Sequence, residues 1–358
     1  MSMIYKIDML SQAAKVKGQG VLSAYDEQVN LVKEGLKDQF IVAENKWPHA
    51  DIIHYHTVNL SYFLSIPFAK MNGVTVGYVH FLPETVDTSL QMPKICKKVF
   101  YKYLIQFYKS MDYLVTVNPY FIERLAAYGV DPDKVTYIPN FVCDKQFYPM
   151  EESTKKDLRE KYGLNKEKFT VLCVGQLQRR KGIFDFIQIA KEMPHMQFVW
   201  AGGFSFGKMT DGYKEIKEVV ENPPENLKFL GIIERESMNE IYNLGDVMFL
   251  PSFEELFPMT ILESMNCRTP ILLRDIDIYK NILFDFYLRG SNVEEFKEIL
   301  NHLACDEVFY EKACAKSWKG HEFYHRNHVL SMWEEFYTGI LDETKPFKFK
   351  NLLSRFVG

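Results

Sequence analysis

The chain has 358 residues, of which 47% are apolar and 25% charged, so its composition is that of a globular protein, not a disordered or fibrous one. This length predicts two domains of ordinary size. The formal net charge of −4 gives no reason to expect nucleic acid as a partner. No stretch approaches the ~18 apolar residues that a membrane-spanning helix needs, and no C-x-x-C cysteine pair occurs. We therefore expect a cytoplasmic protein that meets a membrane only from its surface.

The first part of the chain alternates short apolar runs, typical of buried strands, with longer amphipathic runs, typical of helices. The expected strands are 4–10, 51–56, 75–79, 113–117 and 135–138. The expected helices are 21–36, 60–71, 93–109 and 119–128. Strands and helices in alternation predict a parallel, doubly wound α/β sheet.

This alternation stops after Ile138-Pro139-Asn140, and it restarts beyond a charged stretch at 151–161. The expected strands of the second part are 169–174, 197–201, 227–230, 247–250 and 270–273, with helices at 183–193, 211–220, 236–244 and 259–266. We therefore predict two Rossmann-like domains facing a cleft, at 1–148 and 149–322. A helix to about residue 341 and a basic-aromatic tail make up 323–358.

A first candidate binding segment, GQLQRRKG at 175–182, lies between an expected strand and an expected helix. Its glycines permit close approach of a ligand to the backbone, and its Arg and Lys side chains can neutralise a phosphate group. A solvated basic turn would have the same composition, and this segment alone leaves both interpretations open.

A second candidate segment, PSFEELFPMTILE at 251–263, also follows an expected strand. Pro258 suits the first turn of a helix, where its missing N–H costs nothing. The free N–H groups of that turn can hold a diphosphate. Glu255 would lie in the loop above the site, and Glu263 would lie about a turn and a half into the helix, within reach of ribose hydroxyls. Together with the basic turn, this pattern indicates a nucleotide site.

At this point the sequence resembles the retaining glycosyltransferases of family four, which have the GT-B fold. Glu255 and Glu263 match the family's two glutamates separated by seven residues, and 175–182 matches its Gly-Arg-Leu…Lys-Gly segment. The resemblance covers most of the chain and extends to the glycine-rich segment at 18–21, the DIIHYH strand at 51–56 and His80. The segments at 175–182 and 272–280 are most similar to bacterial transferases that add a second hexose to glucosyl-diacylglycerol.

The resemblance implies transfer of glucose or galactose from UDP-glucose or UDP-galactose to a glycolipid, with retention of the anomeric configuration. It implies catalytic roles for His80, Lys181 and Glu255. The implied donor-binding residues are Gly175, Gln176, Arg180, Lys181, Glu255, Phe257, Pro258, Met259, Thr260 and Glu263. The implied acceptor-binding residues are Gly18, Gly20 and His80.

Two departures from the family pattern bear on the donor site. The usual arginine is Gln176, so Arg179 or Arg180 must supply the missing cation, and we favour Arg180. Leu256 stands where a small residue often follows the first glutamate. No Asp-x-Asp pair is placed for a metal ion, and the cationic cluster makes a metal unnecessary, so we predict a metal-independent enzyme without a cofactor.

The expected helix at 93–109 contains five lysines, five aromatic residues and no acid. A basic amphipathic helix is typical of a protein that lies on an anionic bilayer, although an ordinary helix covering the sheet would also have an apolar face. We predict peripheral binding to the inner face of the cell membrane. The expected contacts are Lys94, Lys97, Lys98, Phe100, Lys102, Phe107 and Lys109, supported by the basic-aromatic tail.

Three alternatives remain open from the sequence. His54 and His56 on the strand at 51–56 are more typical of core histidines than of catalytic ones. The acceptor could be soluble or a polysaccharide, because only the basic helix points to lipid. The loss of the usual arginine at Gln176 could also mark a catalytically silent partner subunit, although Lys181, Glu255 and Glu263 are all present.

Overall fold

The computed structural model describes residues 4–12, 20–46, 49–83, 94–204, 207, 210, 212–255 and 258–342. Two compact units emerge. Unit 1 comprises the described residues up to Asn140 together with helix α14 (Arg326–Leu341), and unit 2 runs from Phe141 to His325. The boundary between the units falls at Asn140, not at 148, and the C-terminal helix is part of unit 1, not a separate tail.

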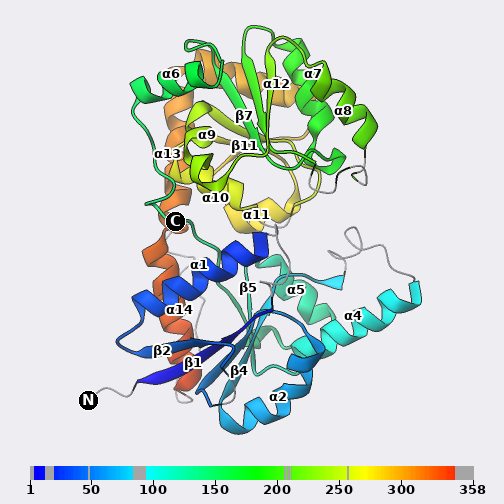
Figure 1. Ribbon diagram of the computed structural model, residues 1–358, viewed down its shortest axis with the longest axis vertical. Coiled ribbons are helices and arrows are strands. Elements are labelled where there is room, and N and C mark those ends of the chain that lie inside the picture. The colour runs from blue at the N-terminus through cyan, green and yellow to red at the C-terminus, as the bar shows by residue number, and fades with distance from the viewer. Residues whose placement is uncertain are drawn as a thin grey trace. The chain divides into compact units, whose positions relative to one another are not determined.

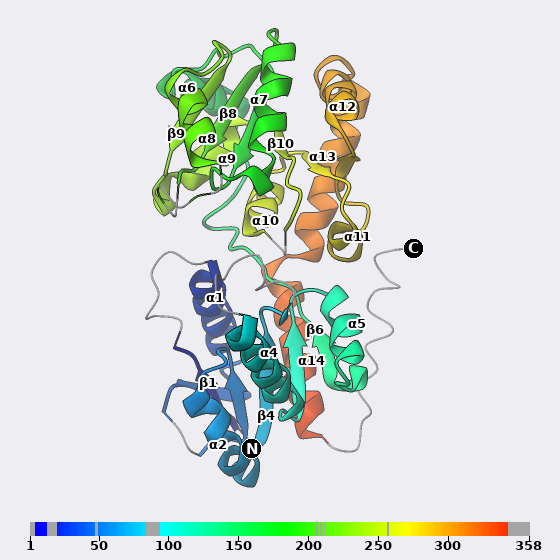
Figure 2. The same ribbon diagram turned by 90° about the vertical axis from the view of Figure 1, so that its right-hand side faces the viewer.

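Unit 1 contains a parallel sheet of six described strands. From one edge to the other they are β2 (Phe40–Glu44), β1 (Tyr5–Leu10), β3 (Ile52–Tyr55), β4 (Val74–Val79), β5 (Tyr113–Thr116) and β6 (Val135–Tyr137). The helices α1 (Gly20–Gly35), α2 (Leu60–Asn72), α4 (Lys94–Lys109), α5 (Tyr120–Ala127) and α14 lie on the two faces of this sheet (Figures 1 and 2).

Helix α14 completes unit 1 although it comes from the far end of the chain. The hydroxyl of Tyr337 lies 2.9 Å from Nδ1 of His54 on β3, and the ring of Trp333 packs against both residues. Arg326 forms an ion pair of 3.0 Å with Glu34 of α1. Large aromatic side chains of α14 thus cover the sheet, which is why this helix belongs to unit 1 and not to a free tail.

Unit 2 contains a second parallel sheet of six described strands. Their order is β12 (Leu288–Gly290), β11 (Ile271–Arg274), β10 (Val247–Leu250), β7 (Thr170–Val174), β8 (Gln197–Ala201) and β9 (Leu227–Gly231). The strand order reverses between β7 and β10. In a doubly wound sheet, ligands bind at the carboxyl ends of the strands beside such a switch point.

The described helices of unit 2 surround this sheet (Figures 1 and 2). They are α6 (Glu152–Lys161), α7 (Ile183–Glu192), α8 (Tyr213–Glu221), α9 (Met238–Leu244), α10 (Met259–Asn266), α11 (Asp277–Leu283), α12 (Val293–Cys305) and α13 (Glu307–Phe323), with 3₁₀ turns η3 (Arg179–Lys181) and η5 (Arg235–Ser237). Phe186 of α7 packs edge-on against Phe198 and Trp200 of β8 and stacks on Phe249 of β10, so aromatic side chains form the core.

The structure confirms the predicted α/β fold of two doubly wound domains and adds elements that the sequence pattern did not indicate. The predicted strands and helices are all present, with ends at most three residues from those expected. Edge strands β2 and β12 and helices α6, α11, α12 and α13 were not predicted; β2 and β12 have only five and three residues, too few for a clear hydrophobic period. Within the described residues, no helix is both long and apolar enough to cross a bilayer.

Candidate functional site

Both candidate segments of unit 2 follow the two strands that flank its switch point. Residues 175–182 connect β7 to α7, and the loop after β10 leads to α10. The amide of Phe253 donates a hydrogen bond of 2.8 Å to the carbonyl of Arg180, so the two segments are joined through their backbones. Segments about 70 residues apart in the chain therefore form one candidate site, as the sheet topology requires.

Glycine is needed in this loop where the backbone is most crowded. Gly182 has a φ of 73°, and a Cβ atom there would lie 2.2 Å from the carbonyl oxygen of Pro251. Gly202, which follows β8, has a φ of 137°, and its Cβ would lie 1.9 Å from the carbonyl oxygen of Gly175. Any other residue at these positions would push the two segments apart. A Cβ atom at Gly175, in contrast, would lie no closer than 4.0 Å to any atom outside its chain neighbours, the nearest being Cδ of Lys181.

Lys181 and Glu255 form a nearly buried ion pair at the switch point. The amine of Lys181 contacts Oε1 of Glu255, and the two side chains are 11% and 6% exposed. Burial, and next the Glu255 carboxylate, raises the pKa of Tyr279 in α11 well above its usual value, so this phenol stays protonated beside the pair. A pair with so little solvent around it offers a strong, preorganised charge to a ligand that can exchange partners with it.

Glu263 is buried in α10, and both of its carboxylate oxygens have partners. Oε1 accepts from Arg235 of η5, and Oε2 accepts from the hydroxyl of Tyr242 in α9. Burial, and next the Glu263 carboxylate, raises the pKa of Tyr242 well above its usual value, so Tyr242 remains a donor. Arg235 also stacks over the ring of Phe147, at 4.7 Å. The carboxylate therefore has a fixed position, and the predicted contact with a ribose requires a carboxylate oxygen to accept a second hydrogen bond beside the one from Arg235 or Tyr242.

Arg274 holds the loop after β10 through three contacts. Its Nε donates a hydrogen bond of 2.9 Å to the carbonyl of Pro251, its guanidinium pairs with Asp185 of α7, and it lies 3.9 Å over the ring of Phe253. Sequence reasoning did not identify Arg235, Tyr242, Arg274 or Tyr279. Arg274 and Tyr279 lie within the stretch at 272–280 that carried a resemblance, whereas nothing in the sequence near Arg235 or Tyr242 pointed to Glu263.

The three consecutive cations of η3 point to different partners. Lys181 pairs with Glu255, Nη1 of Arg180 lies 3.4 Å from the carbonyl oxygen of Glu254, and Arg179 pairs with Glu215 of α8. Arg180 is thus nearer to the glutamate loop, in line with the preference for it over Arg179. Gln176 accepts a hydrogen bond of 2.7 Å from the amide of Gln178.

The beginning of α10 offers unpaired polar groups. Pro258 is its N-cap residue and Met259 its first residue; the N–H of Ile261 donates a hydrogen bond of 3.1 Å to the carbonyl of Pro258, whereas the N–H groups of Met259 and Thr260 have no acceptor within the helix. Oγ1 of Thr260 and Oγ of Ser252 are buried and have no hydrogen-bond partner in the described part of the chain. Groups of this kind can hold phosphate or sugar oxygens. Phe257 and Leu256 lie outside the described residues.

In unit 1, three imidazoles lie at the carboxyl ends of β3 and β4. His80 stacks on Tyr78 with 4.2 Å between ring centroids, and its Nε2 has no hydrogen-bond partner among the described residues. Burial lowers the pKa of His80 to about 4, so this ring is neutral near pH 7. His54 and His56 are buried and lie against each other, as expected for core histidines. Gly20 begins α1, and Gly18 lies outside the described residues.

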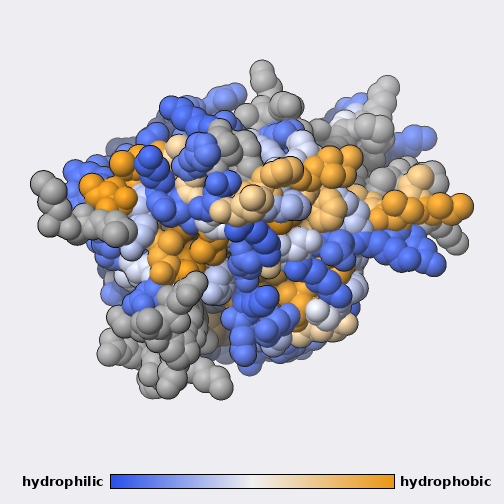
Figure 3. Space-filling view, turned by 90° about the horizontal axis from the view of Figure 1, so that it is seen from below, coloured by the Kyte–Doolittle hydropathy of each residue, from blue (hydrophilic) through white to orange (hydrophobic). Residues whose placement is uncertain are grey.

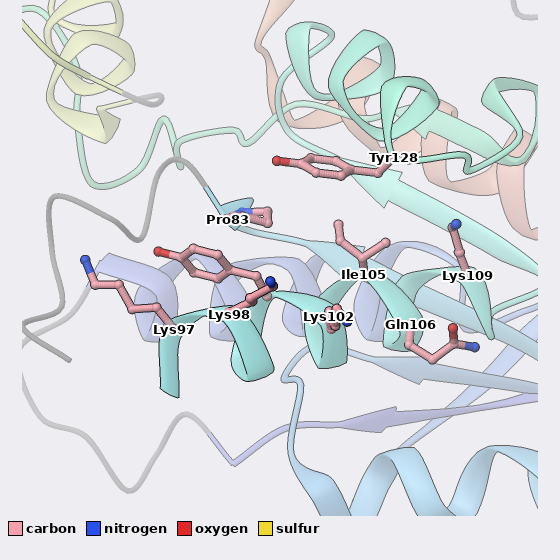
Figure 4. A pocket seen from close by; sticks show the side chains of 9 residues that line it. Pro83, Lys97, Lys98, Lys102, Ile105, Gln106, Lys109 and Tyr128 are labelled. Atoms are coloured by element: carbon pink, nitrogen blue, oxygen red, sulfur yellow. The ribbon is translucent and has the colours of Figure 1, made fainter. Parts of the chain in front are cut away.

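The basic helix is α4, and its lysines surround a pocket. The pocket has a volume of about 780 Å³ and lies along the side of α4 that faces Tyr128, just after α5 (Figure 4). Lys97, Lys98, Lys102 and Lys109 line it together with Tyr101, Ile105 and Tyr128. Lys98, Lys102 and Lys109 form no ion pair with any carboxylate of the described residues. Lys94 begins α4, and Phe100 is half-buried against the core.

One expected membrane contact is wrong. Phe107 is 1% exposed and packs against Phe63 of α2 and Tyr55 of β3, so it belongs to the core and cannot touch lipid. Phe107 lies on the side of α4 opposite its lysines, the side that covers the sheet. The basic-aromatic tail lies outside the described residues. No group of metal-ligating side chains was found in the described part of the chain, and metal independence stays a prediction.

Known proteins are similar to this chain over most of its length. Residues 154–316 match the family described as "Glycosyl transferases group 1", and residues 34–146 match "Glycosyltransferase Family 4". The alpha-galactosylglucosyldiacylglycerol synthase of Streptococcus pneumoniae is 46% identical over 332 residues, which are 93% of this chain and 89% of that protein. The processive diacylglycerol alpha-glucosyltransferase of Acholeplasma laidlawii is 27% identical over 252 residues, or 70% of this chain and 74% of that protein.

Solved structures agree on the fold. HepE of Anabaena in complex with UDP is similar with a TM-score of 0.74 over 94% of this chain and 100% of that chain, at 14% sequence identity. At this identity the likeness shows the GT-B fold alone. The identity with the pneumococcal protein extends over nearly the whole chain, and both family descriptions match consecutive parts of it. The chain therefore belongs to family 4 of the glycosyltransferases, and it is a glycosyltransferase of the GT-B fold.

Proposed function

We propose that this enzyme transfers a hexose from a UDP-sugar to a glucosyl-diacylglycerol, with retention of the anomeric configuration. The observation that carries the proposal is the 46% identity with a galactosylglucosyldiacylglycerol synthase, combined with an intact Lys181–Glu255 pair at the switch point of unit 2. The name of that relative refers to a galactosylglucosyl lipid. UDP-galactose is therefore the first donor to test and UDP-glucose the second.

In this proposal the diphosphate of the donor binds between Lys181 and the free N–H groups at the start of α10. The phosphate oxygens compete with Glu255 for the Lys181 amine, and Glu255 is then free to accept a hydrogen bond from a sugar hydroxyl. Lys181 and Arg180 stabilise the negative charge of the departing nucleoside diphosphate. The acceptor hydroxyl attacks from the face that the leaving group departs, and a phosphate oxygen takes its proton.

The acceptor is proposed to reach the enzyme at an anionic bilayer, which α4 meets with its lysines. Lys98, Lys102 and Lys109 are exposed, and in this proposal their charges attract phospholipid headgroups. Each lysine near an anionic surface contributes about 1 kcal/mol to binding. The aromatic and apolar lining of the adjacent pocket suits an amphiphile better than a free sugar (Figure 4).

The test is transfer of label from radiolabelled UDP-galactose and UDP-glucose into extractable lipid. Vesicles with and without glucosyl-diacylglycerol provide the comparison, and Glu255→Gln is paired with the adjacent, exposed Glu254→Gln as its control. We expect label in lipid only when the glycolipid is present, lost in Glu255→Gln and kept in Glu254→Gln. UDP release without labelled lipid would move the acceptor to something soluble. If neither UDP nor labelled lipid forms, the result favours the silent partner subunit.

The same assay tests the prediction that no metal ion is needed. Activity should persist in a chelator, because Lys181 and the start of α10 supply the positive charge that a metal would otherwise give the diphosphate. Loss of activity in chelator that Mg²⁺ or Mn²⁺ restores would contradict this prediction.

A further inference from the structure

Helix α2 exposes apolar side chains where a helix on a protein surface normally presents polar ones. Leu60, Leu64, Phe68 and Met71 are each at least 63% exposed. Their spacing of four, four and three residues places them on one face of the helix. The opposite face, with Ile66 and Ala69, is buried against the core of unit 1. Helix α2 therefore has apolar residues on its exposed side as well as on its buried side.

The exposed side of α2 carries a single charge, and that charge is paired. Lys70 is the single charged residue of the segment Leu60–Asn72, and its amine forms an ion pair of 2.7 Å with Asp112. The other exposed residues of α2 are Ser61, Pro67 and Asn72, none of which is charged. An exposed apolar helix face of this length is typical of a surface that binds a protein partner or a membrane.

The apolar face continues onto α4. The ring of Tyr103 lies 5.5 Å from that of Phe63 in α2, and its hydroxyl donates a hydrogen bond of 2.6 Å to the carbonyl of Val58, so the two helices are neighbours. Val99 precedes Tyr103 by one turn and Ile95 precedes it by two, so both lie on the side of α4 toward α2. Ile95 is 80% exposed and Val99 is 64% exposed.

Figure 3 looks at the molecule from the side of α2 and shows hydrophobic patches at the surface, bordered by hydrophilic side chains. We call Leu60, Leu64, Phe68, Met71, Ile95 and Val99 the apolar surface of α2 and α4. Next to it along α4 lie Lys98, Lys102 and Lys109, all on the outer side of that helix.

We propose that the apolar surface of α2 and α4 inserts into the bilayer interface, while the lysines of α4 bind anionic headgroups beside it. This inference rests on the proposed membrane acceptor and adds a second helix, whose contribution does not depend on charge. A second copy of the chain is a poorer occupant, because a two-fold interface on this surface would bring the lysine rows of two copies together. An anionic bilayer meets both the apolar and the basic part.

Apolar insertion and the attraction between lysines and headgroups can be told apart by their response to salt. In about 1 M NaCl the Debye length falls to ~3 Å, so the attraction between lysines and headgroups is screened while apolar insertion is not. The full chain and its variants are co-sedimented with phosphatidylglycerol-rich vesicles at low salt and at this high salt. We expect Leu64→Gln/Phe68→Gln to lower the partition constant about tenfold at both salt concentrations. Lys98→Gln/Lys102→Gln should lower it only at low salt.

Two further variants guard against effects on folding. Ile41→Gln/Val308→Gln changes two other exposed apolar residues, one on edge strand β2 and one in unit 2, and should bind like the unchanged chain. Leu64→Trp/Phe68→Trp should bind at least as well as the unchanged chain, because tryptophan favours the bilayer interface. Binding of Leu64→Gln/Phe68→Gln at high salt equal to that of the unchanged chain would overturn the inference. Self-association of the unchanged chain that this variant abolishes would assign the surface to a second copy.

Transfer to glucosyl-diacylglycerol in detergent micelles distinguishes the inference from the proposed function. We expect Leu64→Gln/Phe68→Gln to retain transfer in micelles and to lose it on vesicles. If the unchanged chain transfers no hexose in micelles, the proposed function fails, while vesicle sedimentation still decides whether α2 meets the bilayer.

Discussion

In unit 2 the carboxyl ends of the strands hold charged side chains in pairs, whereas in unit 1 the corresponding ends hold neutral rings. Lys181–Glu255 and Arg235–Glu263 lie beside the switch point of one sheet, and His54, His56 and His80 lie along two strands of the other. The two sheets are both parallel and six-stranded in the described residues, so their backbones do not cause this difference. The side chains at these strand ends therefore set the difference: they place paired charges beside the switch point of unit 2 and neutral imidazoles at the ends of β3 and β4 in unit 1.

This difference suits a division of labour. A diphosphate needs cations held in place before it arrives, and a nearly buried pair such as Lys181–Glu255 keeps both charges in fixed positions. A neutral imidazole with a free nitrogen, such as that of His80, can exchange hydrogen bonds with an uncharged hydroxyl. Substitutions in each unit can show whether the charges of unit 2 and the neutral rings of unit 1 have these separate roles.

The largest effect is expected from Lys181→Ala. Removing the amine should lower the rate of transfer about 10²–10³-fold, because the departing diphosphate loses a preorganised partner. The rate is measured as UDP release and as labelled lipid. Lys191→Ala, in the exposed part of α7, should leave both unchanged. A loss below about threefold in Lys181→Ala would mean that the buried pair is structural and not part of the donor site.

A smaller effect is expected from Arg235→Ala. Without this guanidinium the buried Glu263 carboxylate loses a charged partner and its fixed position, so KM for the UDP-sugar should rise about tenfold with little change in kcat. Tyr242→Phe removes only the hydroxyl that donates to the same carboxylate and should raise KM less. An equal fall of kcat in both variants, with KM unchanged, would contradict a role for Glu263 in holding the nucleotide.

The neutral histidines of unit 1 should make folding stability depend on pH. Burial lowers the pKa of His80 to about 4, and burial with the nearby His80 lowers that of His54 to about 3; His56 is lowered as well. In the unfolded chain these rings titrate at their ordinary pKa of about 6.5, so below that pH the unfolded state binds more protons than the folded state. The contribution of these three rings to the free energy of unfolding is therefore fully present above this pH. It is lost as the pH drops toward their pKa values in the folded state.

Urea unfolding at about pH 7.5 and about pH 5.5 measures this loss of stability. In His54→Phe/His56→Phe the difference between the two pH values should shrink, even if the variant is less stable at both. The same change at exposed His195 in unit 2 should leave the difference as it is. A difference that is unchanged in the double variant would show that other groups cause the pH dependence.

The smallest effect is expected from the two outer cations of η3. Arg180→Ala should lower kcat/KM for the donor about threefold, because its exposed guanidinium lies near the glutamate loop. Arg179→Ala should have less effect, because Arg179 is held by Glu215 and lies over the ring of Phe184, at 4.9 Å. A larger effect of Arg179→Ala than of Arg180→Ala would indicate that Arg179 replaces the arginine that the family has at the position of Gln176.

The sequence was most informative where residues act through local pattern. The alternation of apolar and amphipathic runs predicted the two doubly wound sheets, and the spacing of Glu255 and Glu263 located the loop and helix after β10. It also predicted that α4 is basic along one side. It was least informative about pairing, since nothing near Arg235 or Tyr242 indicates that both meet Glu263.

The sequence by itself determined which residue types stand at the ends of which strands, because hydrophobic period and turn chemistry act over a few residues. Only the tertiary structure decided which of them meet. The reversal of strand order brings η3 against Glu255, and α14 returns to cover β3 with Trp333 and Tyr337. Burial of Phe107 and exposure of Phe68 were likewise decided by packing, because each helix can turn only one side toward its sheet.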